Sequence, residues 1–290
     1  MVSSTTGRWY FVREGLVEGR YGAVMLHVAG DARQLGSAEP RLVFGDQARR
    51  LLLLDEQPAF ALSHWCGTCQ FLFQRLEGAN NSLCLDKLQS RLSAGVDDLD
   101  DEVISSFGAL LEQGTYLPLL LSVKPRLTLP GQAGDYYSEE QVSSWGLSSF
   151  WGLPEYPATA YYRTFETKVD DGTHLFEFVV PMLPPAWNDA VRVAEHAEKL
   201  ASSDRPTAVA VSTLDVCQPA MANQSTDYFA HWGLTHFLLD GHHKMQAAAE
   251  SGRRLRLLSL LSLEGSLASP EQVALIPRLR QKSAVRRQPR

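Results

Sequence analysis

The sequence has little cysteine, no long apolar run and no leader-like start. Four cysteines in 290 residues are too few for a disulfide scaffold, which small secreted domains use in place of a large core. No apolar run is long enough to cross a bilayer. The start, MVSSTTGRWYF, lacks the basic region and apolar core of a signal peptide. We therefore expect a cytoplasmic protein with no membrane partner.

An excess of positive charge is also lacking, except at the C-terminus. The chain has 27 Lys and Arg against 33 Asp and Glu, a net charge of −6. This balance does not favour a nucleic-acid coat or a membrane-surface role. Six basic residues nevertheless crowd the last thirteen, RLRQKSAVRRQPR. We predict that residues 278–290 form a disordered, solvated tail, and contact with an anionic partner is the alternative.

The first half of the chain predicts an N-terminal α+β domain, residues 1–135. Four short β-rich segments separated by Gly, Pro and Asp are typical of a meander: RWYFVRE, YGAVMLHVAG, RLVFGD and RRLLLLDE. Apolar periodicity then predicts two short helices over 67–94 and a further helix ending near Gly114. The prolines of YLPLLLSVKPRLTLP favour an edge strand or a broken one. Loop signals near 130–155 indicate a domain boundary.

The second half predicts another α+β domain, residues 155–265. A hairpin is expected around DDGT, followed by an amphipathic helix in WNDAVRVAEHAEKLAS and a strand in PTAVAVSTLDV. A strand, a helix and a closing strand complete the domain. The overall prediction is an α+β protein whose C-terminal domain is a small mixed sheet flanked by helices.

The turn between that last strand and helix is the main candidate site. It reads Asp240, Gly241, His242, His243 and Lys244. A glycine between a strand and a helix lets a ligand approach backbone N–H groups, and the helix dipole attracts anions there. Lys244, and a protonated histidine, would add charge toward phosphate oxygens. The alternative is an ordinary strand-turn-helix with polar surface histidines.

The segment LLDGHHKMQAAAESGRRLRLLSLL resembles the phosphate-binding element of the ParB/sulfiredoxin superfamily, and the resemblance covers roughly 174–264. His242 stands where sulfiredoxins place their catalytic cysteine, and the helix-turn-helix domain of ParB proteins has no counterpart here. The DGHHK turn looks most like the branch typified by free-serine kinases, with Lys244 in place of an arginine. A lysine lacks the bidentate fork of arginine. The resemblance implies ATP or ADP, Mg²⁺ and a small hydroxyl-bearing substrate.

The kinase branch carries an acidic residue after the proline of its first loop, and Asp189 in PMLPPAWNDAV is the matching carboxylate. The resemblance makes Asp189 the candidate base for a substrate hydroxyl. The alternative is an acid in a first helical turn that complements the dipole. Asp240 is a candidate contact of Mg²⁺, with helix capping as its alternative.

A second candidate site lies in SHWCGTCQF. Cys66 and Cys69 have the spacing of zinc ligands, and His64 or Cys84 would complete a tetrahedron. A redox pair and plain thiols remain alternatives. His231 and His236 lie near the phosphate turn in sequence and are more typical of core or surface histidines.

Three hypotheses of function follow. The first is a nucleotide-binding small-molecule kinase. The second is a nucleotide-binding regulatory or interaction module without catalysis. The third is a CTP- and DNA-binding protein of the ParB kind, which the net charge does not favour.

Overall fold

The structure is a computed structural model of the chain. It describes residues 10–13, 24–28, 49–54, 57–63, 73–80, 86–108, 110–111, 114–140, 159–202, 205–217 and 230–281. Statements about structure refer to these residues.

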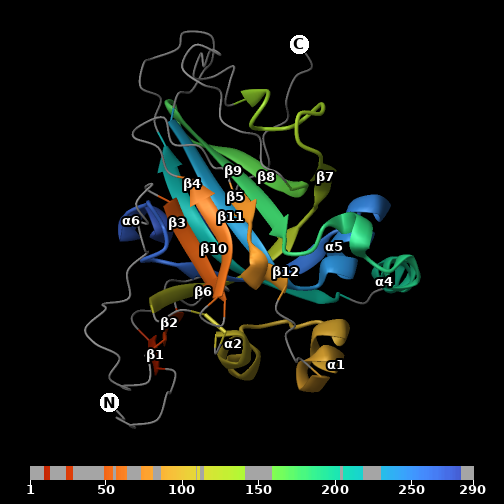
Figure 1. The fold of residues 1–290 in the computed structure, drawn as a ribbon. Helices are drawn as coiled ribbons and strands as arrows, with labels where there is room; N and C mark the ends of the chain where they lie inside the picture. The colour runs from red at the N-terminus through yellow and green to blue at the C-terminus, as the bar shows by residue number, and fades with distance from the viewer. Residues whose placement is uncertain are drawn as a thin grey trace.

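A large mixed sheet dominates the fold (Figure 1), and the predicted α+β class is confirmed. Its strand order is β1-β2-β6-β12-β10-β11-β9-β8-β7. The pairs β10–β12 and β9–β11 are parallel, and the other pairs are antiparallel. The strands are β1 (Tyr10–Arg13), β2 (Val24–Val28), β6 (Gly114–Val123), β7 (Arg126–Thr128), β8 (Tyr161–Asp170), β9 (Thr173–Pro181), β10 (Thr207–Cys217), β11 (Ala230–Asp240) and β12 (Leu255–Ser262).

The sheet curls until two of its distant strands meet. Only Lys124 and Pro125 separate β6 from β7 in the chain, although five strands lie between them in the sheet order. Because a residue spans at most about 3.6 Å, the end of β6 and the start of β7 must be close in space. The strands from β6 to β7 therefore form a curled sheet with an interior and an exterior face.

Helices connect strands that are separated by one other strand in the sheet order. The 3₁₀ turn η3 (Pro185–Trp187) and α4 (Ala190–Ala201) lead from β9 to β10, and α5 (His242–Ser251) leads from β11 to β12. The hairpin β8–β9, this helix-containing connection and the β11–α5–β12 unit occur in the predicted order. Two short helices, α6 (Pro270–Ala274) and α7 (Ile276–Gln281), follow β12. Helices α4 and α5 pack side by side (Figure 1).

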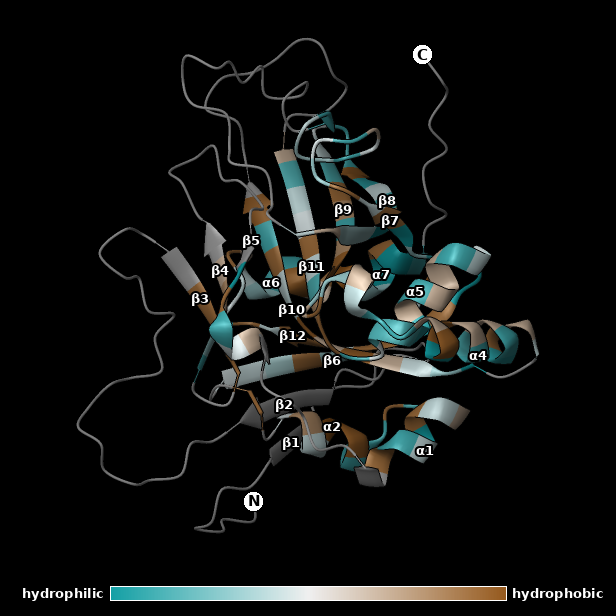
Figure 2. Cartoon of the chain, turned by 45° about the vertical axis from the view of Figure 1, so that its right-hand side comes forward, coloured by the Kyte–Doolittle hydropathy of each residue, from teal (hydrophilic) through white to brown (hydrophobic). Residues whose placement is uncertain are grey.

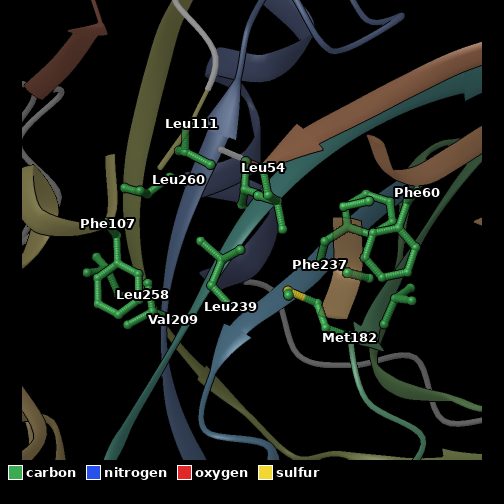
Figure 3. Close-up of a cluster of buried hydrophobic side chains, with 14 of the residues drawn as sticks. Leu54, Phe60, Phe107, Leu111, Met182, Val209, Phe237, Leu239, Leu258 and Leu260 are labelled. Carbon is green, nitrogen blue, oxygen red and sulfur yellow. The ribbon is translucent and has the colours of Figure 1, made fainter. Parts of the chain in front are cut away.

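Each face of the sheet supports its own apolar core. On the exterior face, Phe237 of β11 packs against Phe60, with ring centroids 5.1 Å apart, and Figure 3 shows this cluster. Phe60 belongs to a second sheet, β3-β4-β5, formed by β3 (Arg49–Leu54), β4 (Gln57–Ser63) and β5 (Phe73–Arg75). Alternate residues of β11, Leu234 and Leu238, belong to the interior core, as a strand's period of two requires. Hydrophobic residues are frequent along these central strands (Figure 2).

The interior face also holds a chain of polar side chains. Oγ of Ser212 lies 2.7 Å from Oγ of Ser259 and 2.6 Å from Nδ1 of His236. Nε2 of His236 is 3.8 Å from Oε2 of Glu177, which pairs with Nε of Arg280 at 3.1 Å. Burial alone would raise the pKa of Glu177, but the charge of Arg280 and the contacts of His236 hold that pKa at about 2.

Arg280 shows that α7 lies inside the curl. Its guanidinium donates to the carbonyl of Ser122 on β6 at 3.0 Å, pairs with Glu177 on β9, and lies 4.3 Å from the ring centroid of Phe165 on β8. In the sheet order β6 is separated from β9 and β8 by the strands β12, β10 and β11, so one side chain reaches all three strands only across the interior of the curl. Residues 278–281, the start of the predicted basic tail, thus belong to a packed helix, and residues 282–290 lie outside the described residues.

The predicted N-terminal elements are confirmed in part. Strands form at three of the four predicted segments, and the fourth, RLVFGD, lies outside the described residues. Helices α1 (Asp86–Ala94) and α2 (Asp101–Gly108) match two of the three predicted helices. The first prediction is wrong, because residues 73–75 pair with β4 as β5 and a 3₁₀ turn, η1 (Glu77–Asn80), follows. Long-range strand pairing overrides the local apolar period there.

The continuous sheet bears on two further predictions, the division into two domains and the edge strand in residues 116–130. The segments predicted as separate domains, 1–135 and 155–265, both contribute strands to it, since β6 pairs with β12 and β7 with β8. β6 is an inner strand, but β2 covers it only at residues 114–116. Pro118 pairs with Leu260 on β12 beyond that point. A proline is tolerated where its nitrogen faces away from a ladder.

Candidate functional site

The candidate site is the junction of β11 and α5, and Gly241 makes it possible. Gly241 has φ 94°, in the left-handed region. A Cβ at this position would lie 2.7 Å from Cβ of Ala208. Glycine therefore satisfies both the backbone conformation and the close approach to β10. Among the described residues no side chain caps the start of α5, so no side-chain acceptor takes its first N–H groups.

The two histidines of the turn hold the loop that follows β9. Nε2 of His242 accepts a hydrogen bond from the N–H of Met182 at 3.1 Å. Nε2 of His243 accepts from the N–H of Asp189 at 3.1 Å. Each Nε2 must be unprotonated to accept. The histidines therefore fix residues 182–189 against the first turn of α5.

These histidines are neutral near pH 7. Burial lowers the pKa of His242 to about 4, and the charges of His243 and Arg75 also lower it. Burial and the charge of Arg192 lower the pKa of His243 as well. The expectation that a histidine supplies positive charge at this turn is therefore corrected: both are hydrogen-bond acceptors. Arg75 and Arg192 are the arginines whose charges act on these histidines.

Lys244 is buried and already engaged. Its Nζ donates to the carbonyl of Thr207 at 2.9 Å and to Oδ2 of Asp240 at 3.1 Å. The side chain is 6% exposed, against 26% for Asp240. Asp240 and Lys244 thus tie the end of β11 to α5 and to the start of β10. Their first role is to shape the turn.

Asp189 is brought to the start of α5, 54 residues away in sequence. Its Oδ1 accepts from the N–H groups of Val191 and Arg192 at 2.8 and 3.4 Å, which makes it the N-cap of α4. The residue is exposed. Next to it, Nδ2 of Asn188 donates to Oε1 of Gln246 at 2.7 Å. The capping role weighed as the alternative for Asp189 is present, and the carboxylate still faces solvent.

Sequence reasoning missed an aromatic residue at this site. Trp187 is 67% exposed and Val191 is 68% exposed, and both lie beside Asp189. The guanidinium of Arg75 lies 5.8 Å from the ring centroid of Trp187 and also donates to the carbonyl of Met182. The sequence signal for it was a tryptophan placed two residues before the helix cap in PPAWND. Arg75 comes from β5, so nothing local indicated it.

The other predicted site residues lie elsewhere. His64, Cys66, Cys69 and Cys84 fall outside the described residues, so the zinc prediction stays a prediction. Within the described part of the chain, no three His, Cys, Asp or Glu side chains are placed to hold a metal ion. His236 belongs to the polar chain of the interior face. His231 is buried, with Nδ1 2.6 Å from the hydroxyl of Tyr136.

Comparison of the chain with protein-family models, with curated proteins and with solved structures finds no match. Among the helices that the structure describes, none has the length and apolar character needed to cross a membrane.

Proposed function

We propose that this protein binds ATP or ADP with the phosphates at the start of α5. Three features support the proposal. The first turn of α5 is uncapped, and Arg75 and Arg192 carry charge close to the two histidines. Trp187 offers an exposed ring nearby. The sequence of this turn also resembles the phosphate-binding element of the ParB/sulfiredoxin superfamily. Membership of that family and a cytoplasmic location are parts of the same proposal.

One observation carries the proposal furthest: the hydrogen bond from the N–H of Asp189 to His243. It brings an exposed carboxylate to the helix start at which the phosphates are proposed to bind. We propose that the chain is a kinase for a small hydroxyl-bearing metabolite, with Asp189 as the base. The hydroxyl oxygen bonds to the γ-phosphorus, its proton passes to Asp189, and the bond to the leaving ADP oxygen breaks.

Mg²⁺ is the cofactor of this proposal. Such sites hold Mg²⁺ with one or two carboxylates and the substrate phosphates. Asp240, at the end of β11 and 26% exposed, is the carboxylate that would contribute. The metal would neutralise phosphate charge. Asp240 also pairs with Lys244, which keeps one of its oxygens, Oδ2, engaged.

A second candidate function is a nucleotide-binding regulatory or interaction module without catalysis. It is favoured by two contacts: Asp189 caps α4 and Lys244 is paired with Asp240. Both residues thus have structural roles that need no catalytic one.

The variant Asp189→Asn separates the two functions, because asparagine is as good an N-cap as aspartate. ATP turnover against a panel of small hydroxyl compounds and ATP affinity would both be measured. A kinase loses turnover by about 10² or more and keeps its affinity. Glu195→Gln, on the exposed part of the same helix, is the matched control and keeps both. Nucleotide binding without turnover in the wild type would leave the regulatory module.

A further inference from the structure

Arginines gather at the other end of α4 and α5. Both helices start at the candidate site, since His243 bonds to Asp189. Both end at a groove of about 1060 Å³, lined by Ser202 after α4 and by Arg253 after α5. Figure 2 shows the two helices together, with α1 below α4. The ten residues of α5 separate the groove from the candidate site by about 15 Å.

Four arginines from two stretches of the chain line this groove. Arg205 follows α4, Arg253 and Arg254 precede β12, and Arg256 lies in β12. Asp97, in the turn between α1 and α2, also lines it. The chain as a whole has a net charge of −6, so this concentration of positive charge is local.

Two of the four guanidiniums are engaged by the protein. Arg256 pairs with Asp97 through Nη1. Arg254 donates through Nη1 to the carbonyl of Ser122 at 3.4 Å, which also accepts from Arg280. Within the described residues, the guanidiniums of Arg205 and Arg253 have neither an ion pair nor a hydrogen bond.

The dipoles of α4 and α5 explain why some positive charge lies at this groove, but they do not explain four arginines. The carbonyl ends of α4 and α5 favour one or two cations nearby. Among the described residues that line the groove, four arginines against Asp97 and Asp98 leave two positive charges in excess. Like charges held together repel, and an anion with several oxygens would relieve that repulsion. Guanidinium groups hold phosphate through paired N–H donors.

We propose that this groove binds a small polyanion that carries two or more linked phosphate groups, with Arg205 and Arg253 as its main contacts. The hydroxyl of Ser202, which lines the same groove, is a further donor. The proposal stands apart from the nucleotide site, because its residues lie at the opposite ends of both helices. A ligand in this groove touches α4 and α5 at once.

The test titrates inorganic pyrophosphate, without metal, into the full chain by calorimetry at low salt. The variant Arg205→Gln, Arg253→Gln removes the two guanidiniums. The variant Arg126→Gln, Arg278→Gln is the matched control, because it removes the same charge from exposed positions outside the groove. We expect saturable binding that falls at least tenfold in the first variant, is retained in the control and weakens with added salt.

Two results would overturn the proposal: no saturable binding by the wild type, or an equal loss in both variants. Binding that is kept in Arg205→Gln, Arg253→Gln and lost in Arg192→Gln would also overturn it, because that result would place the anion at the start of α5. Circular dichroism of the variants checks that the fold is kept.

Discussion

Two regions of this protein hold histidines among charged groups, and they differ in what faces solvent. In the interior of the curled sheet, His236 and Glu177 are fully buried and Arg280 closes the chain of polar side chains. At the start of α5, His242 and His243 turn inward to hold a loop whose other side exposes a carboxylate and an indole ring. The first region stabilises the fold. The second keeps the Asp189 carboxylate and the Trp187 ring exposed to solvent.

The largest change in the free energy of unfolding is expected from Arg280→Met in the interior region. It leaves the buried carboxylate of Glu177 without its cation, which costs about 3–5 kcal/mol. Arg278→Met, on the exposed side of the same helix, is the control and costs less than about 0.5 kcal/mol. Urea unfolding measures both. Adding Glu177→Gln to Arg280→Met should restore part of the loss. Equal unfolding curves for the two single variants would contradict the structural role of the interior region.

The next effect is expected from Gly241→Ala at the candidate site. The new Cβ would meet Ala208 at 2.7 Å with φ at 94°, so we expect a loss of about 2–3 kcal/mol of unfolding free energy. Gly252→Ala is a close control, because Gly252 also has a positive φ, 64°, and nothing within 4 Å of a Cβ. It should cost about 1 kcal/mol. If both cost the same, the close packing on β10 is not what requires Gly241.

A pH effect of intermediate size is expected from His242. Its pKa is about 4 in the folded protein against 6.5 in the unfolded chain. The unfolded chain therefore gains a proton first, and stability that is present above pH 6.5 is lost as the pH falls toward 4. The loss is about 2 kcal/mol by pH 5 and about 3 kcal/mol by pH 4. His242→Gln keeps an acceptor for Met182 but does not titrate, so its stability should change less over this range. Parallel pH profiles for the two proteins would refute the assignment.

The smallest effect is expected at Asp189. Asp189→Ala removes the N-cap of α4 and should cost about 1 kcal/mol. Asp189→Asn should unfold like the wild type, since asparagine also caps. Thermal unfolding compares the two variants. A large loss in Asp189→Asn would mean that its negative charge supports the fold, and the contrast between the two regions would be weaker.

Local patterns predicted the local elements well. The glycine and alanines around Gly241 predicted the strand-helix junction, and DDGT predicted the hairpin turn of β8–β9. The curl of the sheet could not be predicted, because it depends on β7 pairing with β8 far along the chain. For the same reason Arg280 looked like part of a solvated tail, although its partner Glu177 lies 103 residues earlier.

The sequence predicted the position of the turn between β11 and α5, but it did not predict the charges of the side chains there. His242, His243 and Lys244 looked like three cations at a helix start. Their burial and contacts, which depend on the loop before α4, make the histidines neutral and occupy the lysine. Asp189 was predicted from a resemblance, and its meeting with His243 depends on the packing of α4 against α5.

The most direct test of the account is a calorimetric titration of ATP with Mg²⁺ into the wild type and into His243→Glu. Glutamate can still accept from the N–H of Asp189, and a negative charge suits a helix start, but it repels phosphate. Gln132→Glu, at an exposed turn, adds the same charge elsewhere. We expect saturable binding that falls at least tenfold in His243→Glu and persists in Gln132→Glu. Equal affinity in all three proteins, or no binding by the wild type, would contradict it.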